Sequence, residues 1–203
     1  MIAHQAVLNE LRGADRRSIG RSNQVVDTVR RAPSLFPLLI NGLEDEDPLV
    51  RMRAADAAEK LTVKNPQLLQ PFKRRLINLA AQAEQQELRW HLAQMLPRLE
   101  LSDKDRKSVA TILRGYLKDK SRIVKTFAMQ SLADLALQDS RLLASVTRRI
   151  SAIMRKGSPA MKSRGRKLLL QLKTVENIIK ERLEIAPSRP SLKIDTVQDV
   201  RHI

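Results

Sequence analysis

Hydrophobic and polar positions along this chain form a block that recurs at nearly constant spacing. Each block begins with an apolar residue followed by Arg or Lys, and the four pairs are Val-Arg, Leu-Arg, Val-Lys and Met-Lys. Apolar or small residues then stand four, eight and eleven positions after the first. The copies begin 38, 36 and 37 residues apart, at Val50, Leu88, Val124 and Met161. These spacings place the apolar residues on one face of an α-helix, so the pattern predicts four equivalent amphipathic helices.

A second apolar pattern precedes each of these blocks and follows the same offsets. Two positions four residues apart share one helical face, which predicts a further helix in each unit. We call the first helix of a unit A and the second B. Helix pairs repeated at this period stack into solenoids, and an all-α fold of four to five pairs is therefore predicted. The apolar A-helix positions are Leu39, Ile77, Leu113 and Ile150, then Leu43, Ala81, Leu117 and Met154.

Helix-breaking residues indicate where the units divide. Asn65-Pro66 separates the first two regular units, and Pro97 predicts that the second B helix kinks or ends there. We expect one domain over residues 1–185. It comprises a degenerate pair at 1–32, repeats at 33–172 and a capping helix at 173–185. Residues 186–203 contain two prolines and no periodic stripe, and are predicted to form an extended tail.

Composition narrows the class of protein. Hydrophobic residues make up 42% of the 203 residues but aromatics only 2%, which predicts an aliphatic core. The absence of cysteine excludes a disulfide framework and thiolate metal sites. The first residues lack the pattern of a signal peptide, and no apolar run is long enough for a membrane span. We therefore expect a soluble cytoplasmic protein without a membrane partner.

The basic residues are unevenly distributed. The formal net charge is +16, and residues 140–193 hold fourteen Lys and Arg against three Glu. This excess favours nucleic acid or an acidic peptide as a partner, whereas the alternative is a solvated basic surface. Aromatic residues are not interleaved with the charge, so contacts to phosphates are expected rather than base stacking. The candidate anion-binding residues are Arg148, Arg149, Arg155, Lys156, Lys162, Arg164, Arg166, Lys167 and Lys173.

The turn before the first regular B helix carries a recognisable motif. Its sequence is Asp45-Glu46-Asp47-Pro48-Leu49-Val50-Arg51. This acidic turn followed by Val-Arg and a small-residue helix resembles HEAT repeats of the armadillo-like superfamily, over roughly residues 33–172. The resemblance implies a right-handed α-α superhelix and a scaffold or adaptor that binds proteins, although some members bind nucleic acid.

The resemblance also implies a ladder of hydrogen bonds between Asp and Arg of neighbouring repeats. Ala83 and Lys156 replace the acidic residue in the second and fourth units, so the ladder is expected to be partial. Arg51 and Arg89 are accordingly interpreted as structural residues.

The concave face formed by the B helices is the expected protein-binding surface. Trp90 lies about 200° around the helix from Leu88, away from the core stripe. An exposed Trp beside Arg is typical of interface hot spots, whereas the alternative is that Trp90 fills space against the neighbouring repeat. The candidate protein-binding residues are Arg53, Arg89, Trp90 and His91.

Catalytic motifs are missing from the sequence. The three histidines are isolated, and Glu87 with His91 lacks the further ligands of a zinc site. No glycine motif of nucleotide-binding proteins or hydrolases occurs. We therefore predict no enzyme activity, no metal and no cofactor. A DNA glycosylase built of HEAT-like repeats is a minor alternative, which the scarcity of aromatic residues disfavours.

Overall fold

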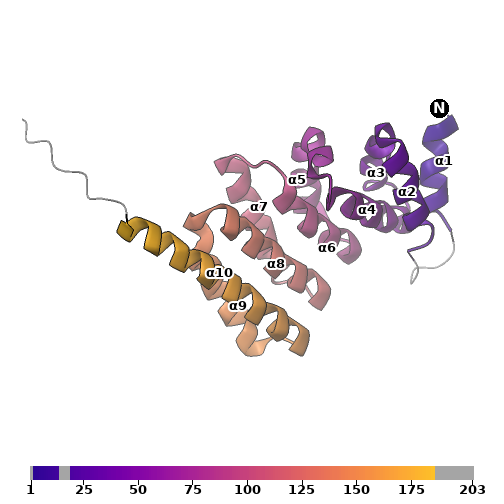
Figure 1. Ribbon diagram of the computed structural model, residues 1–203. Coiled ribbons are helices and arrows are strands. Elements are labelled where there is room, and N and C mark those ends of the chain that lie inside the picture. The colour runs from indigo at the N-terminus through magenta and orange to yellow at the C-terminus, as the bar shows by residue number, and fades with distance from the viewer. Residues whose placement is uncertain (1, 14–18, 186–203) are drawn as a thin grey trace, which may run out of the picture.

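The chain forms an elongated stack of helix pairs (Figure 1). The computed structural model describes residues 2–13 and 19–185, and within these ranges it contains helices and no strand. The predicted tail at 186–203 lies outside the described residues. These observations confirm the predicted all-α solenoid. The pairs are α1 (Ile2–Leu11) and α2 (Ser22–Arg31), α3 (Phe36–Gly42) and α4 (Pro48–Thr62), α5 (Lys73–Gln82) and α6 (Gln86–Met95), α7 (Asp103–Tyr116) and α8 (Arg122–Gln138), and α9 (Leu143–Lys156) and α10 (Pro159–Ile185).

The second helices of the pairs form one continuous layer. Helix α4 packs against α2 and α6, α8 packs against α6, and α10 packs against α8. Each A helix from α3 to α9 packs on the B helix that follows it. We call the surface formed by α2, α4, α6, α8 and α10 the B-helix face.

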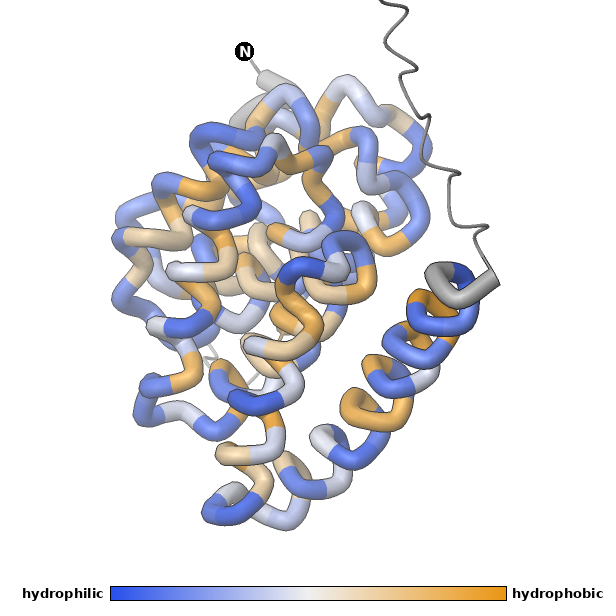
Figure 2. Tube along the Cα trace, turned by 90° about the vertical axis from the view of Figure 1, so that its left-hand side faces the viewer, coloured by the Kyte–Doolittle hydropathy of each residue, from blue (hydrophilic) through white to orange (hydrophobic). Residues whose placement is uncertain are grey.

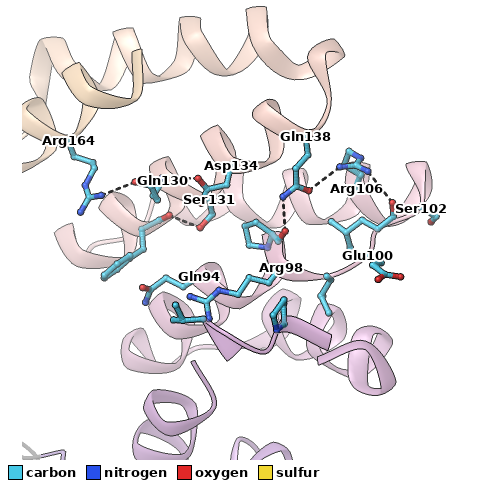
Figure 3. A pocket seen from close by; sticks show the side chains of 16 residues that line it. Gln94, Arg98, Glu100, Ser102, Arg106, Gln130, Ser131, Asp134, Gln138 and Arg164 are labelled. Atoms are coloured by element: carbon cyan, nitrogen blue, oxygen red, sulfur yellow. Dashed lines mark hydrogen bonds between the residues drawn. The ribbon is translucent and has the colours of Figure 1, made fainter. Parts of the chain in front are cut away.

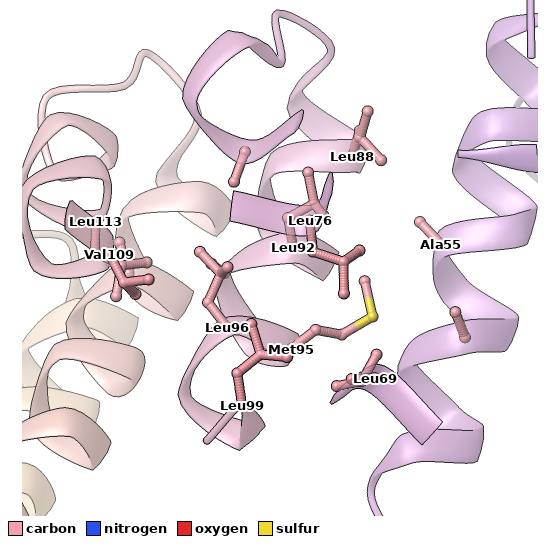
Figure 4. Close-up of a cluster of buried hydrophobic side chains, with 14 of the residues drawn as sticks. Ala55, Leu69, Leu76, Leu88, Leu92, Met95, Leu96, Leu99, Val109 and Leu113 are labelled. Atoms are coloured by element: carbon pink, nitrogen blue, oxygen red, sulfur yellow. The ribbon is translucent and has the colours of Figure 1, made fainter. Parts of the chain in front are cut away.

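The core is made by the predicted stripes of the B helices. Every apolar residue predicted to lie on the stripes of α4 and of the segment 88–99 is buried. Figure 4 shows how Leu92 and Met95 lie between Leu76 of the preceding A helix and Ala55 of α4. Small residues such as Ala54 and Gly42 let helices approach closely, because a Cβ on Gly42 would lie 2.9 Å from the Ala54 Cβ.

The A-helix pattern is wrong by one residue in the second unit. Ile77 is half-buried and Ala81 is exposed, whereas Leu76 and Ala80 are buried. The preceding segment, Pro66–Phe72, is a 3-10 helix, and α5 begins only at Lys73. The tighter winding of the 3-10 segment rotates the helix that follows it, so the neighbouring residues face the core.

Side-chain caps fix where the B helices begin. The Asp47 carboxylate accepts from the Leu49 N–H at 2.8 Å, and Pro48 occupies the first turn of α4. The Ser121 hydroxyl accepts from the Val124 N–H at the start of α8. These bonds satisfy N–H groups that have no partner inside the helix. Pro97 acts as predicted, since α6 ends at Met95 and Leu96–Arg98 forms a 3-10 turn.

The last helix is longer than the units suggested. Helix α10 runs unbroken for 27 residues, so the last B helix and the capping segment expected at 173–185 form one helix. Hydrophobic and hydrophilic residues alternate around it (Figure 2). Leu168 and Leu172 are buried against the stack, whereas Leu170 and Ile178 face solvent.

Candidate binding groove on the B-helix face

A groove of about 930 Å³ opens on the B-helix face. Its walls come from the end of α6 and the 3-10 turn after it, from α8 and from the first part of α10, and Val63 and Pro66 also line it. Figure 3 shows side chains from these elements converging on the groove. The groove therefore spans three consecutive repeats.

Three side chains form a hydrogen-bonded row along one wall. The Arg164 guanidinium donates to the Gln130 side-chain oxygen at 2.9 Å, and the Gln130 amide donates to Asp134 Oδ1 at 2.8 Å (Figure 3). Burial raises the pKa of the Asp134 carboxyl above its ordinary value, although the Gln130 amide and the positive charges of Arg98 and Arg164 oppose this effect. The Asp134 carboxylate of this row is thus partly desolvated and lies in the field of two cations.

Other polar side chains hold the floor of the groove rigidly. The Arg98 guanidinium donates to the Glu59 carbonyl at 2.7 Å and forms an ion pair with the Glu59 carboxylate. The Ser131 hydroxyl donates to the Ala93 carbonyl at 2.7 Å, and the Gln138 amide donates to the Pro97 carbonyl at 2.9 Å. Each bond joins one repeat to the next, so the polar groups of the groove have fixed positions.

Arg53 is not a surface residue, contrary to its prediction as a protein-binding residue. Its side chain is only 2% exposed, and its guanidinium donates to the carbonyls of Leu11 at 2.8 Å and Gly13 at 3.1 Å. Gly20 packs against it, because a Cβ there would lie 2.7 Å from the Arg53 Cζ. The N-terminal pair covers this residue, and its role is to join α4 to that pair.

Trp90 and His91 lie outside the lining of the groove. Trp90 is half-buried and packs against the core, and its ring centroid is 5.5 Å from that of His91. His91 is buried, and its Nδ1 has no hydrogen-bond partner among the residues that the structure describes. Burial lowers the pKa of His91, while the carboxylates of Asp56 and Glu59 oppose this effect. Trp90 thus fills space in part, as the alternative interpretation expected.

Arg89 and Arg51 join neighbouring repeats. The Arg89 guanidinium donates to the Ala83 carbonyl and forms an ion pair of 2.6 Å with Asp119 of the next repeat. The Arg51 guanidinium donates to the Asp45 carbonyl at 2.7 Å and to the Gln85 side-chain oxygen at 2.9 Å. These contacts confirm the structural interpretation of both residues, and they use the Arg89 side chain that was also predicted to bind a protein.

The predicted anion-binding residues are all exposed but do not converge on the groove. Arg148, Arg149 and Arg155 lie on α9, and only Arg164 of α10 lines the groove. Lys156 lines a separate, smaller cavity near the turn between α9 and α10. Among the residues that the structure describes, Arg164 is the member of this set that hydrogen-bonds to another side chain.

The groove residues Gln94, Gln130 and Asp134 were not singled out from the sequence. Gln94 and Gln130 occupy the same position in successive B helices, 36 residues apart. That position is polar beside two buried stripes, which is the available sequence signal for a solvent-facing column. Nothing in the pattern shows that the column is hollowed.

Comparison with known proteins identifies the repeat. Residues 35–62, which include the pair α3 and α4, match the HEAT repeat family. The chain therefore contains a HEAT repeat. The structural repetition of this pair continues through α10. One similar solved structure is the crystal structure of an engineered protein, which is 14% identical, with 86% of this chain and 98% of that chain covered and a TM-score of 0.42. A search of curated proteins finds no match.

Over residues 2–13 and 19–185, no group of three or more His, Asp or Glu side chains is placed to hold a metal ion. None of the described helices combines the length and the apolar character needed to cross a membrane.

Proposed function

We propose that this HEAT-repeat protein is a scaffold that binds an extended segment of a protein partner in the groove of the B-helix face, the face predicted to be concave. The observation that carries the proposal is the groove itself, which spans three repeats and encloses about 930 Å³. Family members with this repeat are mostly scaffolds, and such binding needs no catalytic group.

The chemistry of the groove suits a peptide backbone. Beyond the bonds that they already make, Gln94 and Gln130 each retain an amide N–H and a carbonyl lone pair, which match the N–H and C=O groups of an extended chain. Phe127 and Leu101 provide apolar surface beside them. Asp134 and Arg164 add one carboxylate and one guanidinium, which favour a segment carrying both charges.

Site-specific photocrosslinking in cells tests this proposal. A photoreactive residue at Gln94, inside the groove, is expected to capture a discrete partner, whereas the same residue at Lys107, on the exposed side of α7, is not. The substitution Phe127→Ala, which removes apolar groove surface, should reduce capture from position 94 at least fivefold. Equal capture from both positions, or capture unaffected by Phe127→Ala, would contradict groove binding.

Nucleic-acid binding by α9 and α10 is a second candidate. The specific observation that favours it is the exposure of all nine candidate anion-binding residues. Eight of them form no hydrogen bond or ion pair with any of the described side chains, and Arg164 is the exception. Unpaired cations on one end of the stack can neutralise phosphates and release counterions. This role would be independent of sequence, because the cations are not accompanied by base-stacking aromatics.

A titration of duplex DNA against salt tests the second candidate. For wild-type protein, the log–log slope of the binding constant against salt concentration should be about −0.9 for each phosphate contacted. Replacing Arg148 and Arg155 by Gln should make that slope less steep by about 1.8. Replacing Lys104 and Lys107 of α7 makes the same change of charge elsewhere and should leave the slope unchanged. Absence of binding at about 50 mM salt would exclude this candidate.

The glycosylase alternative gains no support from the groove. Phe127 is the one aromatic residue among those that line it. Tyr116 is buried, and its hydroxyl donates to the Ala80 carbonyl at 2.6 Å. Neither Trp90 nor Tyr116 is therefore placed to hold a base beside Asp134, and we propose no catalytic role.

A further inference from the structure

A recurring contact joins the first repeats to one another on the side where the B helices begin. Three times in succession a guanidinium reaches an acceptor of the following unit. Arg12 donates to Asp45 at 3.0 Å, Arg51 to Gln85 at 2.9 Å, and Arg89 to Asp119 at 2.6 Å. Each junction thus pairs a cation with an oxygen acceptor.

The fourth junction lacks the acceptor. Lys125 stands 36 residues after Arg89 and is the equivalent cation, whereas Lys156 stands 37 residues after Asp119 in place of the acceptor. A cation therefore occurs at both equivalent positions. Neither amine makes a hydrogen bond or an ion pair with any residue that the structure describes.

A cavity of about 500 Å³ lies at this junction. Arg122, Lys125 and Lys156 line it, together with Ser158 before the first turn of α10, and no carboxylate is among its lining residues. Asp119 is the acidic residue whose charge acts on Lys125, but Asp119 is already bound by Arg89 and by the Ser121 N–H at 2.7 Å. Three cations consequently share one cavity without a counter-charge from its walls.

We propose that this junction binds a phosphate group, which takes the place of the acceptor in the ladder. A phosphate offers several oxygens, so it can accept from Lys125, Lys156 and Arg122 together and relieve the repulsion among them. The Ser158 hydroxyl provides a further donor at the rim of the cavity. The inference does not depend on the groove binding a protein, since the cavity lies at a different place on the stack.

A backbone NMR titration with inorganic phosphate at constant ionic strength tests the proposal. Shifts are expected to concentrate at residues 122–125 and 156–161. The double substitution Lys125→Gln and Lys156→Gln should weaken the fitted affinity at least tenfold. The double substitution Lys104→Gln and Lys107→Gln, which removes equal charge from α7, should change it by less than twofold. Shifts spread over the whole surface, or equal affinities of the two double variants, would overturn the proposal.

A repaired ladder separates loss of the site from loss of the fold. Lys156→Asp restores an acidic residue opposite Lys125, as in the junction of Arg89 and Asp119. This variant should lose the phosphate-induced shifts while its thermal unfolding midpoint equals or exceeds that of the wild type. Retention of phosphate binding by Lys156→Asp would contradict the assignment of the site.

Titration with duplex DNA distinguishes the sources of the phosphate. If the group belongs to a nucleic-acid backbone, the salt slope of the Lys125→Gln and Lys156→Gln variant should be less steep by about 1.8 than that of the α7 control. If the slope is unchanged while binding of inorganic phosphate is lost, the group belongs to a free phosphate or a small phosphorylated molecule.

Discussion

The Arg89 guanidinium lies 2.6 Å from the Asp119 carboxylate of the next repeat, and its carbon is 5.8 Å from the centroid of the Tyr116 ring. The same guanidinium donates to the Ala83 carbonyl in its own repeat. One side chain therefore fixes the turn before α6 and the position of the following pair. This arrangement makes the stack cooperative at its boundaries, where a solenoid relies on contacts between neighbours.

Removing Asp119 should destabilise the protein. Its side chain is 6% exposed, so Asp119→Ala leaves Nη1 of Arg89 and the Ser121 N–H without this acceptor, although Arg89 Nε keeps the Ala83 carbonyl. We expect a loss of about 2 kcal/mol in the free energy of unfolding, measured by urea denaturation. A double-mutant cycle with Arg89→Ala should show a coupling above about 0.5 kcal/mol. Additive effects would mean that the two residues act separately.

Arg53 should behave as a buried structural residue. Arg53→Met keeps the length of the side chain but leaves the carbonyls of Leu11 and Gly13 without this donor. Unpaired buried carbonyls cost about 1–3 kcal/mol each, so we expect a loss of about 2–4 kcal/mol. Arg74→Met, at an exposed position of α5, is the matched control and should change stability by less than about 0.5 kcal/mol. Equal unfolding midpoints for the two variants would show that Arg53 is not buried.

Two glycines should respond to alanine in opposite directions. Gly20 has a φ of 53°, and an added Cβ would meet the Arg53 side chain, so Gly20→Ala should cost about 1–3 kcal/mol. Gly115 lies inside α7 with no atom within 4 Å of an added Cβ. Gly115→Ala should therefore stabilise the protein by about 0.5–1 kcal/mol. Thermal melts of both variants check this contrast, and destabilisation by Gly115→Ala would contradict it.

The regular repeats could be predicted from the sequence because apolar side chains recur at the same helical spacing in each unit. The core stripes of α4 follow from that period, whereas the ladder role of Arg89 was implied by the resemblance to HEAT repeats. Pro97 ends its helix for a reason that is local to the backbone. Ile77 was misplaced because the 3-10 segment before α5 changes the helical phase, which side-chain periodicity does not record.

The site depends on relations that the sequence does not show. Arg53 is covered by the N-terminal pair, which lacks the repeat motif, so its burial could not be inferred from α4. Asp134 and Arg164 belong to different repeats, 30 residues apart, and lie in one groove through the packing of α8 against α10. The distribution of charge along the sequence predicted a strongly basic C-terminal half. Only the stacking of the helices shows that Lys125 and Lys156 line one cavity.

The stability of the protein should fall as the solution becomes acidic through the histidine range. Burial lowers the pKa of His91 below the value of about 6.5 of an exposed histidine. Asp56, Glu59 and Glu87 oppose this effect, and Lys60 reinforces it. Below pH 6.5 the unfolded chain therefore takes up this proton more readily than the folded one. Stability is then lost with a slope of at most about 1.4 kcal/mol per pH unit from this group.

Urea denaturation between pH 7.5 and 5.5 measures this effect, in a range above the titration of ordinary carboxyl groups. The control is His91→Gln, which removes the titrating group and should flatten the dependence over the same range. A wild-type stability that rises on acidification, or a slope that His91→Gln leaves unchanged, would show that His91 is not responsible.

The ionised carboxylate of Asp134 should lower the stability of the protein at neutral pH, although it contributes to the proposed binding of a partner in the groove. Because burial raises its pKa, the folded state disfavours the ionised form. The cost is absent below the unfolded pKa of about 3.9, grows as the pH rises toward the raised folded pKa, and is complete above it. Asp134→Asn keeps an acceptor for Gln130, so it should stabilise the protein by up to about 1 kcal/mol at pH 7 and have little effect at pH 3.5.

If the groove binds the proposed partner through this carboxylate, the same variant should reduce crosslinking from position 94. A more stable variant with weaker capture would place Asp134 in the binding surface, whereas a less stable one would mean that Arg98 and Arg164 together offset the cost of burying the charge.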